Sequence, residues 1–218
     1  MLKAGMVSAM RDAGREVCSM RKRALFLGDS NTYGYDPRGW GGGRYPAEIR
    51  WTDTLAAAVK DSWEIIPLGQ NGRCIPDPVY EQRYYDQLLR DCGPLDLFAV
   101  MLGTNDVVLT GRPSGSSAIR KMDAFLQYLT AETRPFRILL IAPPLLPKVA
   151  EQSAAYLPYA RELKKLGPGY EKLAEKYGAL FWNAGAFPFP MAYDHVHFSE
   201  EGHRLFSQHM EAYLLSLA

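Results

Sequence analysis

The sequence predicts an α/β fold: a three-layer α/β/α sandwich around a five-stranded parallel sheet. Two observations support this prediction. Five short apolar runs have the length of strands, and amphipathic helical patterns separate them along the chain. Runs that are apolar at nearly every position are typical of parallel strands, which are buried on both faces. Strands that alternate with helices form right-handed crossover units, which place helices on both sides of one sheet.

The predicted strands are short, and each is bounded by polar or glycine-rich sequence. They are residues 24–28, 63–68, 95–102, 136–143 and 179–182. No stretch of the chain approaches the ~20 apolar residues of a membrane span. We therefore expect no membrane partner.

Five helices are predicted between and after these strands. The first, WTDTLAAAVK, opens with Thr-Asp, a pair that favours a capped helix N-terminus. The next three have apolar residues three and four positions apart, which is the spacing of one helical face. The predicted helices are residues 51–60, 81–90, 116–130, 169–178 and 200–218.

The composition is that of an ordinary globular protein. The 218 residues are 47% hydrophobic and 22% charged, with a formal net charge of +1. This length suits one domain, and the charge balance gives no indication of a nucleic-acid or membrane-surface partner. We expect one domain over residues 21–218. Charged residues in residues 1–20 interrupt the apolar run that a secretory signal needs, which argues against such a signal. We expect this segment to be a disordered or helical extension.

The three cysteines are far apart in the chain, at Cys18, Cys74 and Cys92. They match no metal-ligand spacing, and their odd number argues against a disulfide framework. Both facts favour a reducing compartment, so we expect a cytoplasmic protein.

Two long segments follow strand ends. Residues 35–50 are rich in glycine, proline and aromatic residues, and residues 143–168 contain several prolines. Long loops in compact domains are more often functional than accidental. Open α/β sheets bind ligands at the carboxyl ends of their strands. Both segments are therefore expected to border a site.

Four polar clusters stand at or near the predicted strand ends. They are Gly-Asp-Ser-Asn at 28–31, Gly-Gln-Asn-Gly-Arg at 69–73, Gly-Thr-Asn-Asp at 103–106 and Asp-His-Val-His-Phe at 194–198. The carboxyl ends of parallel strands share one edge of the sheet, so the first three clusters should converge. The fourth lies where the chain returns after the last strand.

These clusters contain the groups that acyl transfer needs. A serine is a weak nucleophile without an adjacent base, and histidine can be that base. A carboxylate orients the imidazole, and N–H donors stabilise the oxyanion. Ser30, His197 and Asp194 can supply the nucleophile, the base and the carboxylate. The oxyanion donors would be the N–H groups of Ser30 and Gly72 and the side chain of Asn105. This chemistry requires no metal or organic cofactor.

Each cluster also has a simpler interpretation. Gly-Asp-Ser after a strand, Gly-Thr-Asn-Asp and Asp-x-x-His before a helix can all be helix caps, and Asn-Gly is a turn signal. All four clusters together, in this order and at these strand ends, are much harder to explain as caps.

The combined motifs resemble the SGNH, or GDSL, hydrolase family. That family has a serine in Gly-Asp-Ser, a glycine in its second block, an asparagine in Gly-x-Asn-Asp and a late Asp-x-x-His. Here these are Ser30, Gly72, Asn105 and His197, and the resemblance covers residues 23–218. It implies a flavodoxin-like SGNH hydrolase fold and a Ser-His-Asp mechanism.

Several longer stretches are similar to the branch of aryl esterases and acyltransferases, also called perhydrolases. They are RYPAEIRWTDTLA, LDLFAVMLGTNDV, IAPPLLP and DHVHFSEEGHRL. The resemblance implies a small-molecule ester substrate and a homo-oligomer whose loops shape the entrance to the site.

The chain also departs from the family pattern. Its first block reads GDSN where the usual form is GDSL, so Asn31 places a polar side chain beside the nucleophile. Asn71-Gly72 stands where the close branch has Ser-Ala, and the stretch Tyr33-Gly34-Tyr35 has an aromatic residue where that branch often has tryptophan.

The predicted substrate-binding residues are Asp29, Asn31, Trp40, Asn71 and Arg73. Asp29 is too close to Ser30 in sequence to act as the triad acid, which favours a local structural role, and the same role is expected for Asp106. Arg50 and Arg73 could bind an acidic substrate, but a salt bridge is the preferred interpretation. His195 is expected near the rim, and His203 and His209 at surface or packing positions.

The leading prediction is a serine esterase or acyltransferase that acts on small acyl groups. A carbohydrate O-deacetylase is the alternative. A non-catalytic binding module of the same fold is a third reading, and the complete set of triad residues argues against it.

Overall fold

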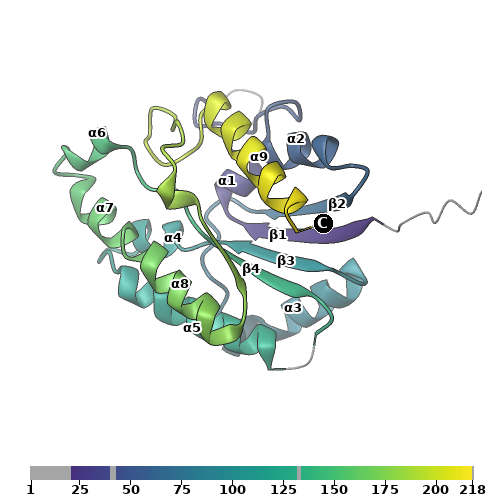
Figure 1. Cartoon of the computed structure of the whole chain (residues 1–218). Coiled ribbons are helices and arrows are strands. Elements are labelled where there is room, and N and C mark those ends of the chain that lie inside the picture. The colour runs from purple at the N-terminus through teal and green to yellow at the C-terminus, as the bar shows by residue number, and fades with distance from the viewer. Residues whose placement is uncertain (1–20, 40–42, 132–133, 218) are drawn as a thin grey trace, which may run out of the picture.

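A five-stranded parallel sheet forms the centre of the computed structural model, which describes residues 21–39, 43–131 and 134–217 (Figure 1). The strand order is β2-β1-β3-β4-β5. The chain runs outward from β1 to β2 and then crosses to β3 on the other side, so the topological switch lies between β1 and β3. The strands are β1 (Lys22–Gly28), β2 (Trp63–Gly69), β3 (Leu97–Met101), β4 (Arg137–Ala142) and β5 (Leu180–Asn183).

Nine α-helices accompany the sheet in the described residues. They are α1 (Ser30–Tyr33), α2 (Trp51–Ala58), α3 (Pro78–Cys92), α4 (Thr104–Val108), α5 (Gly115–Thr130), α6 (Lys148–Glu151), α7 (Leu157–Leu163), α8 (Leu166–Tyr177) and α9 (Glu200–Leu215). A 3₁₀ turn at Ala184–Ala186 follows β5.

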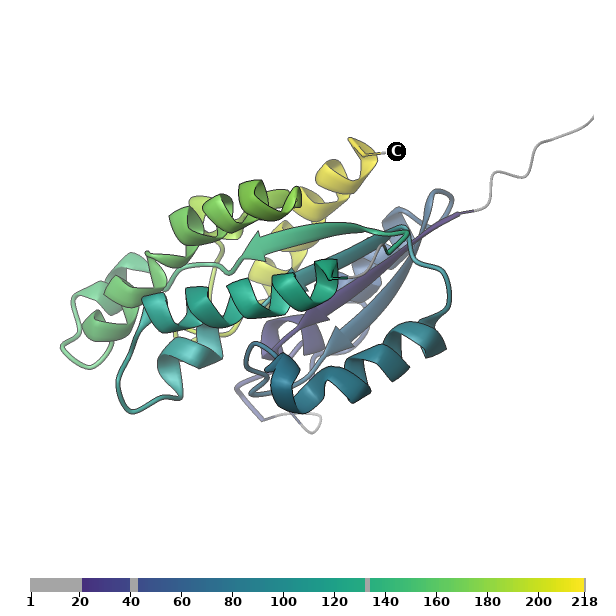
Figure 2. The same ribbon diagram turned by 90° about the horizontal axis from the view of Figure 1, so that it is seen from below.

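The helices cover both faces of the sheet. Helices α2 and α9 lie on one face, and α3, α5 and α8 lie on the other (Figures 1 and 2). Alternate residues of the strands point to opposite faces. In β3, Phe98 and Val100 belong to the core on the α5 side, whereas Leu97 and Ala99 belong to the core on the α9 side. The predicted three-layer sandwich is confirmed, and so are its five strands and five long helices, with shifted ends.

The predicted cap of the first long helix is wrong. Helix α2 begins at Trp51 after an Arg50 N-cap that makes no side-chain cap bond. Asp53, in the first turn, forms an ion pair with Arg50 instead, with an N–O distance of 2.7 Å.

The segment predicted as a long loop at 143–168 contains helices α6 and α7 and the start of α8. Leu163 and Leu166 of this segment are buried against the α5 side of the sheet. Its prolines lie before these helices or within their first three residues, where a backbone N–H has no partner inside the helix, so they do not prevent helix formation.

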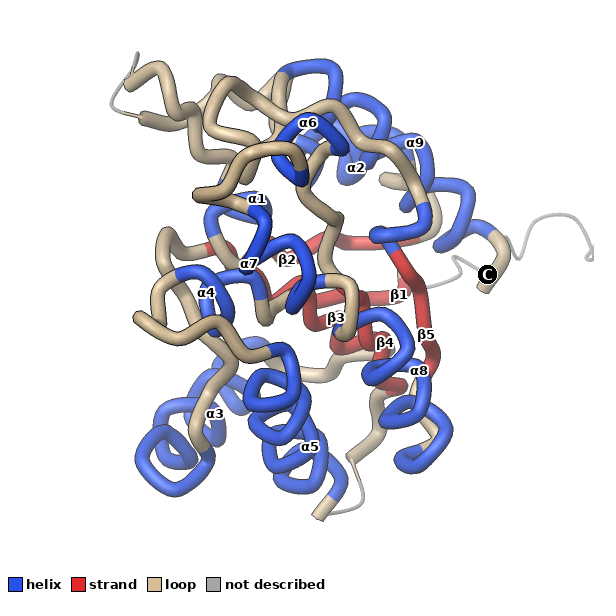
Figure 3. The backbone as a smooth tube through the Cα atoms, turned by 90° about the vertical axis from the view of Figure 1, so that its left-hand side faces the viewer, coloured by secondary structure: helices blue, strands red, loops and turns tan. Residues whose placement is uncertain are grey.

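Short helices gather at the carboxyl edge of the sheet. Figure 3 looks on to this edge, where α1, α4, α6 and α7 stand in front of the red strands. Two glycines allow α1 to pack so closely there. A Cβ on Gly69 would lie 2.1 Å from the backbone nitrogen of Tyr33, and one on Gly28 would lie 2.0 Å from Thr32 Oγ1. Ser30 therefore stands close against the ends of β1 and β2.

The prediction for residues 1–20 falls outside the described residues. In the part of the chain that the structure describes, no helix is both long and apolar enough to cross a membrane.

Candidate active site

Ser30 is the first residue of the one-turn helix α1, directly after β1. The carboxylate of Asp29 caps this helix, because its Oδ1 accepts a hydrogen bond of 2.9 Å from the Asn31 N–H. Gly34 ends the helix in the left-handed conformation, with φ of 83°. This tight strand-to-helix turn holds the Ser30 hydroxyl at the carboxyl edge of the sheet.

A continuous chain of hydrogen bonds connects Ser30 to the late Asp-x-x-His motif. His197 Nε2 lies 2.9 Å from Ser30 Oγ, and His197 Nδ1 lies 2.6 Å from Asp194 Oδ2. The structure therefore brings together three residues that are up to 167 positions apart in the chain.

Asp194 also organises its own loop. Its Oδ1 accepts hydrogen bonds from the backbone N–H groups of Val196 and His197, at 3.1 and 3.0 Å. Burial alone would raise the pKa of this carboxyl, but the hydrogen bonds from His197 and from the two backbone groups bring it below its usual value. Asp194 is thus held as a carboxylate that faces the imidazole.

Aromatic side chains hold the histidine loop from outside. The ring of Tyr35 lies 4.6 Å from the ring of His197, between ring centres. The Tyr193 hydroxyl donates a 2.6 Å hydrogen bond to the Pro37 carbonyl, and Tyr156 packs edge-on against His195 at 5.4 Å. The sequence contained no signal for the Tyr193 contact, because a lone tyrosine in a loop has no periodic pattern.

The predicted oxyanion donors lie on the segments after β2 and β3. Asn105 is the second residue of α4, and its amide donates a 2.9 Å hydrogen bond to the Arg73 carbonyl. Gly72 is exposed and has φ of 72°, and a Cβ placed there would meet no atom within 4 Å. A left-handed residue in open space lets the backbone face a ligand without steric hindrance.

Asp106 has the structural role that was predicted for it. Its side chain is buried, accepts a 2.8 Å hydrogen bond from the Ile75 N–H and pairs with Lys121 at 2.7 Å. These bonds attach the segment after β2 to α4, so they hold Gly72 and Asn105 in a common framework.

Asp29 is 3% exposed and lies beneath the site. Burial raises the pKa of its carboxyl from 3.8 to about 6, although the Asn31 N–H and the charges of His197 and Arg73 act in the opposite direction. The sequence identified Asp29 as a neighbour of Ser30 but could not show this burial.

The other predicted substrate-binding residues occupy different positions. Asn71 is exposed beside Gly72, whereas Asn31 is buried and both ends of its amide bind backbone next to His197. Arg73 donates to the carbonyls of Gly28 and Leu68, so it connects the ends of β1 and β2. Trp40 lies outside the described residues.

The Arg50 salt bridge is confirmed through Asp53, whereas the guanidinium of Arg73 bonds backbone carbonyls and the Gln70 side chain.

His203 is fully buried. Its Nδ1 accepts a 3.4 Å hydrogen bond from the Trp51 N–H, and burial lowers its pKa to about 3, helped by the charges of His197 and Arg50. His203 is thus a neutral packing residue, and His209 packs against the ring of Phe187. In the described ranges, no group of three or more His, Cys, Asp or Glu side chains could hold a metal ion.

A parallel α/β sheet that presents a Ser–His–Asp hydrogen-bonded chain at its carboxyl edge is typical of serine hydrolases. The chain belongs to the GDSL-like lipase/acylhydrolase family, whose model matches residues 26–205. The family predicted from the motifs is thereby confirmed.

Two solved structures show the likeness in three dimensions. Est24, a carbohydrate acetylesterase from Sinorhizobium meliloti, is 25% identical, with a TM-score of 0.76 over 91% of this chain and 100% of its own. The native aryl esterase of M. smegmatis is also 25% identical, with a TM-score of 0.76 over 90% of this chain and 100% of its own. No curated protein matches the sequence.

Proposed function

We propose that this ester hydrolase acts on small acyl esters through an acyl-enzyme on Ser30. The Ser30 Oγ forms a bond to the ester carbonyl carbon while His197 Nε2 takes its proton. The tetrahedral intermediate collapses, the alcohol leaves, and it takes the proton from His197. Water then adds to the acyl-enzyme with His197 again as base, which releases the acid and frees Ser30.

The observation that carries this proposal is the continuous chain from Ser30 Oγ through His197 to Asp194, at 2.9 and 2.6 Å. Both distances are within hydrogen-bond range, so the base is in place before substrate binds. The lowered pKa of Asp194 supports its role, because the carboxylate must stay ionised to stabilise the imidazolium.

The oxyanion would lie among the backbone N–H groups of Ser30 and Gly72 and the amide of Asn105. An asparagine amide has two donor hydrogens. Because one Asn105 donor binds the Arg73 carbonyl, which fixes the orientation of the amide, the second can be directed at the substrate.

Hydrolysis of p-nitrophenyl esters from acetate to octanoate tests the proposal. Ser30→Ala should lower kcat by at least ~10³-fold, as expected for loss of the nucleophile from a triad. Ser116→Ala, on the exposed surface of α5, is the matched control and should keep wild-type activity. A Ser30→Ala enzyme within tenfold of wild type would reject Ser30 as the nucleophile. Turnover that falls with acyl length would support a preference for small acyl groups.

A carbohydrate O-deacetylase is the second candidate, and the similarity to Est24 favours it. Comparing an acetylated xylo-oligosaccharide with an aryl acetate separates the two. Transfer to an alcohol in place of water is part of the first proposal, and adding an alcohol to the p-nitrophenyl assay should then yield a new ester.

We also propose that residues 21–218 act as one cytoplasmic hydrolase domain that forms a homo-oligomer. The free thiols of Cys74 and Cys92 support a reducing compartment. Tyr35, Pro37 and Tyr156 contact the histidine loop, and the segments that contain them would offer the contact surfaces. Light scattering that finds only a species near the chain mass of 24.5 kDa would reject the oligomer.

A further inference from the structure

Asn31 connects the part of the chain that carries Ser30 to the loop that carries His197. We infer that Asn31 is a positioning residue, whose side-chain amide fixes the backbone of His197 against Ser30. This inference rests on the proposed function, because it gives Asn31 a role only if Ser30 and His197 react as a pair.

The amide of Asn31 binds the peptide groups on both sides of His197. Its Nδ2 donates to the Val196 carbonyl at 3.1 Å, and its Oδ1 accepts from the Phe198 N–H at 2.8 Å. Asn31 follows Ser30 directly in the chain, so one residue links the nucleophile to both neighbours of the base.

This pairing depends on the chemistry of an amide. Val196 offers an acceptor and Phe198 offers a donor, so the bridging side chain must present one donor and one acceptor on a short planar group. Leucine, the usual residue of the family at this position, has neither. A carboxylate has two acceptors and would repel the Val196 carbonyl. Asn31 is 4% exposed, so water cannot readily replace a lost bond.

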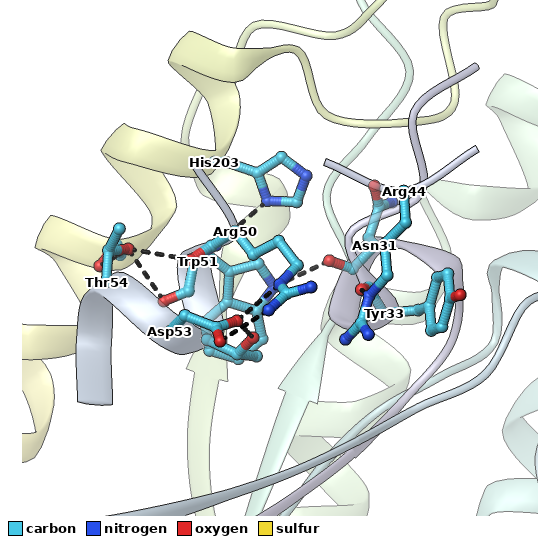
Figure 4. Close-up of polar contacts among 10 residues, drawn as sticks. Asn31, Tyr33, Arg44, Arg50, Trp51, Asp53, Thr54 and His203 are labelled. Carbon is cyan, nitrogen blue, oxygen red and sulfur yellow. Dashed lines mark hydrogen bonds and ion pairs between the residues drawn. The ribbon is translucent and has the colours of Figure 1, made fainter. Parts of the chain in front are cut away.

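The backbone of Asn31 is itself held on two sides. Its N–H binds the Asp29 carboxylate at 2.9 Å, and its carbonyl accepts a 2.9 Å hydrogen bond from Trp51 Nε1. Figure 4 shows the Asn31 carbonyl directed at Trp51, whose own N–H binds His203. Trp51 is 1% exposed and packs on Phe26 and Phe206. Asn31 thus connects the buried core around Trp51 to the histidine loop.

Asp194 and Asn31 divide the control of His197 between them. Asp194 orients the imidazole through Nδ1 and binds the N–H groups of Val196 and His197 within the same loop. Asn31 attaches the backbone on both sides of His197 to the residue that follows Ser30. The loop also contains His195 with a φ of 63°, a conformation that non-glycine residues rarely adopt, so it needs external contacts to hold its shape. A shift of ~1 Å in a reacting group can cost about 10²-fold in rate.

The test compares Asn31→Leu and Asn31→Asp with wild type on p-nitrophenyl acetate. Both replacements are close to asparagine in size. We expect kcat to fall about 10- to 100-fold in each, because His197 loses its fixed distance to Ser30, while KM stays within about threefold. The rate at which a small fluorophosphonate inactivates the enzyme should fall by the same factor, since this reaction reports activation of Ser30 without a bound ester.

Thr54→Val is the matched control. It removes the 2.9 Å hydrogen bond between Thr54 and Ser207 that connects α2 to α9, and it should lower the melting temperature without changing kcat. Asn31→Leu with a kcat within threefold of wild type would overturn the inference. So would failure of both Asn31 variants to fold, because Asn31 would then be a general stabilising residue. If Ser30→Ala instead keeps its activity, the proposed function itself fails, and the two failures are told apart.

Discussion

The buried carboxyl of Asp29 should make the stability of the fold depend on pH. Both the sign of this effect and its pH range follow from the structure. Burial raises its pKa from 3.8 to about 6, so the folded protein holds this proton more tightly than the unfolded chain. Between these two values the native state binds more protons than the unfolded state. The free energy of unfolding therefore falls as the pH rises from about 4 through about 6.

The magnitude follows from the size of the shift. One pKa unit corresponds to ~1.4 kcal/mol, so ionised Asp29 lowers the stability of the fold by about 3 kcal/mol above pH 6. The side chain is 3% exposed, so solvent does not screen this cost. Asp29→Asn removes the charge and keeps an oxygen that can accept from the Asn31 N–H. The variant should gain stability over wild type as the pH rises, by about 2 kcal/mol between pH 4 and pH 8, because part of the full effect is already present at pH 4.

Urea unfolding of both proteins at intervals from pH 4 to pH 8 measures this difference. Groups that do not interact with Asp29 cancel when one curve is subtracted from the other. Asp61→Asn, at an exposed turn after α2, is the control for loss of an aspartate outside the site. A difference for Asp29→Asn that changes by less than about 1 kcal/mol over this range would refute the reasoning. We also expect kcat to fall, because the carboxylate near His197 stabilises the imidazolium that forms during the reaction.

Three further substitutions test other parts of the site. Asp194→Asn should preserve the fold but lower kcat by about 10⁴-fold, because an amide favours the wrong imidazole tautomer. Turnover of p-nitrophenyl acetate measures this loss, and a loss under tenfold would contradict the prediction. Gly72→Ala should destabilise the fold by about 1–2 kcal/mol in urea, because its φ of 72° is costly for alanine although the space is open. Gly69→Ala should lower the free energy of unfolding by at least ~3 kcal/mol, because its Cβ would lie 2.1 Å from the Tyr33 nitrogen and must displace α1. Equal losses of stability for the two glycine variants would argue against this packing.

Much of the fold was predictable from local patterns. The strands are apolar because both of their faces are buried, and the long helices have one apolar stripe, so each pattern records burial within a single element. Helices α6 (Lys148–Glu151) and α7 (Leu157–Leu163) were not predicted, because they are short and lie in proline-rich sequence. Four- and seven-residue helices offer too few turns for a periodic signal.

The sequence by itself also determined which residues could form the triad. Ser30 lies just after a predicted strand, and the carboxyl ends of parallel strands share one edge of the sheet. Asp194 and His197 were predicted from the Asp-x-x-His motif, where the chain returns after the last strand. Only the tertiary structure decided which groups the neighbours of the triad bind. Arg73 binds backbone carbonyls at the ends of β1 and β2, and Asn31 binds the peptide groups beside His197. The contacts of Arg73 with Gly28 and of Asn31 with Val196 and Phe198 join residues 45 to 167 positions apart. Their partners are backbone groups that every residue carries, so no pattern of side chains along the chain could specify them.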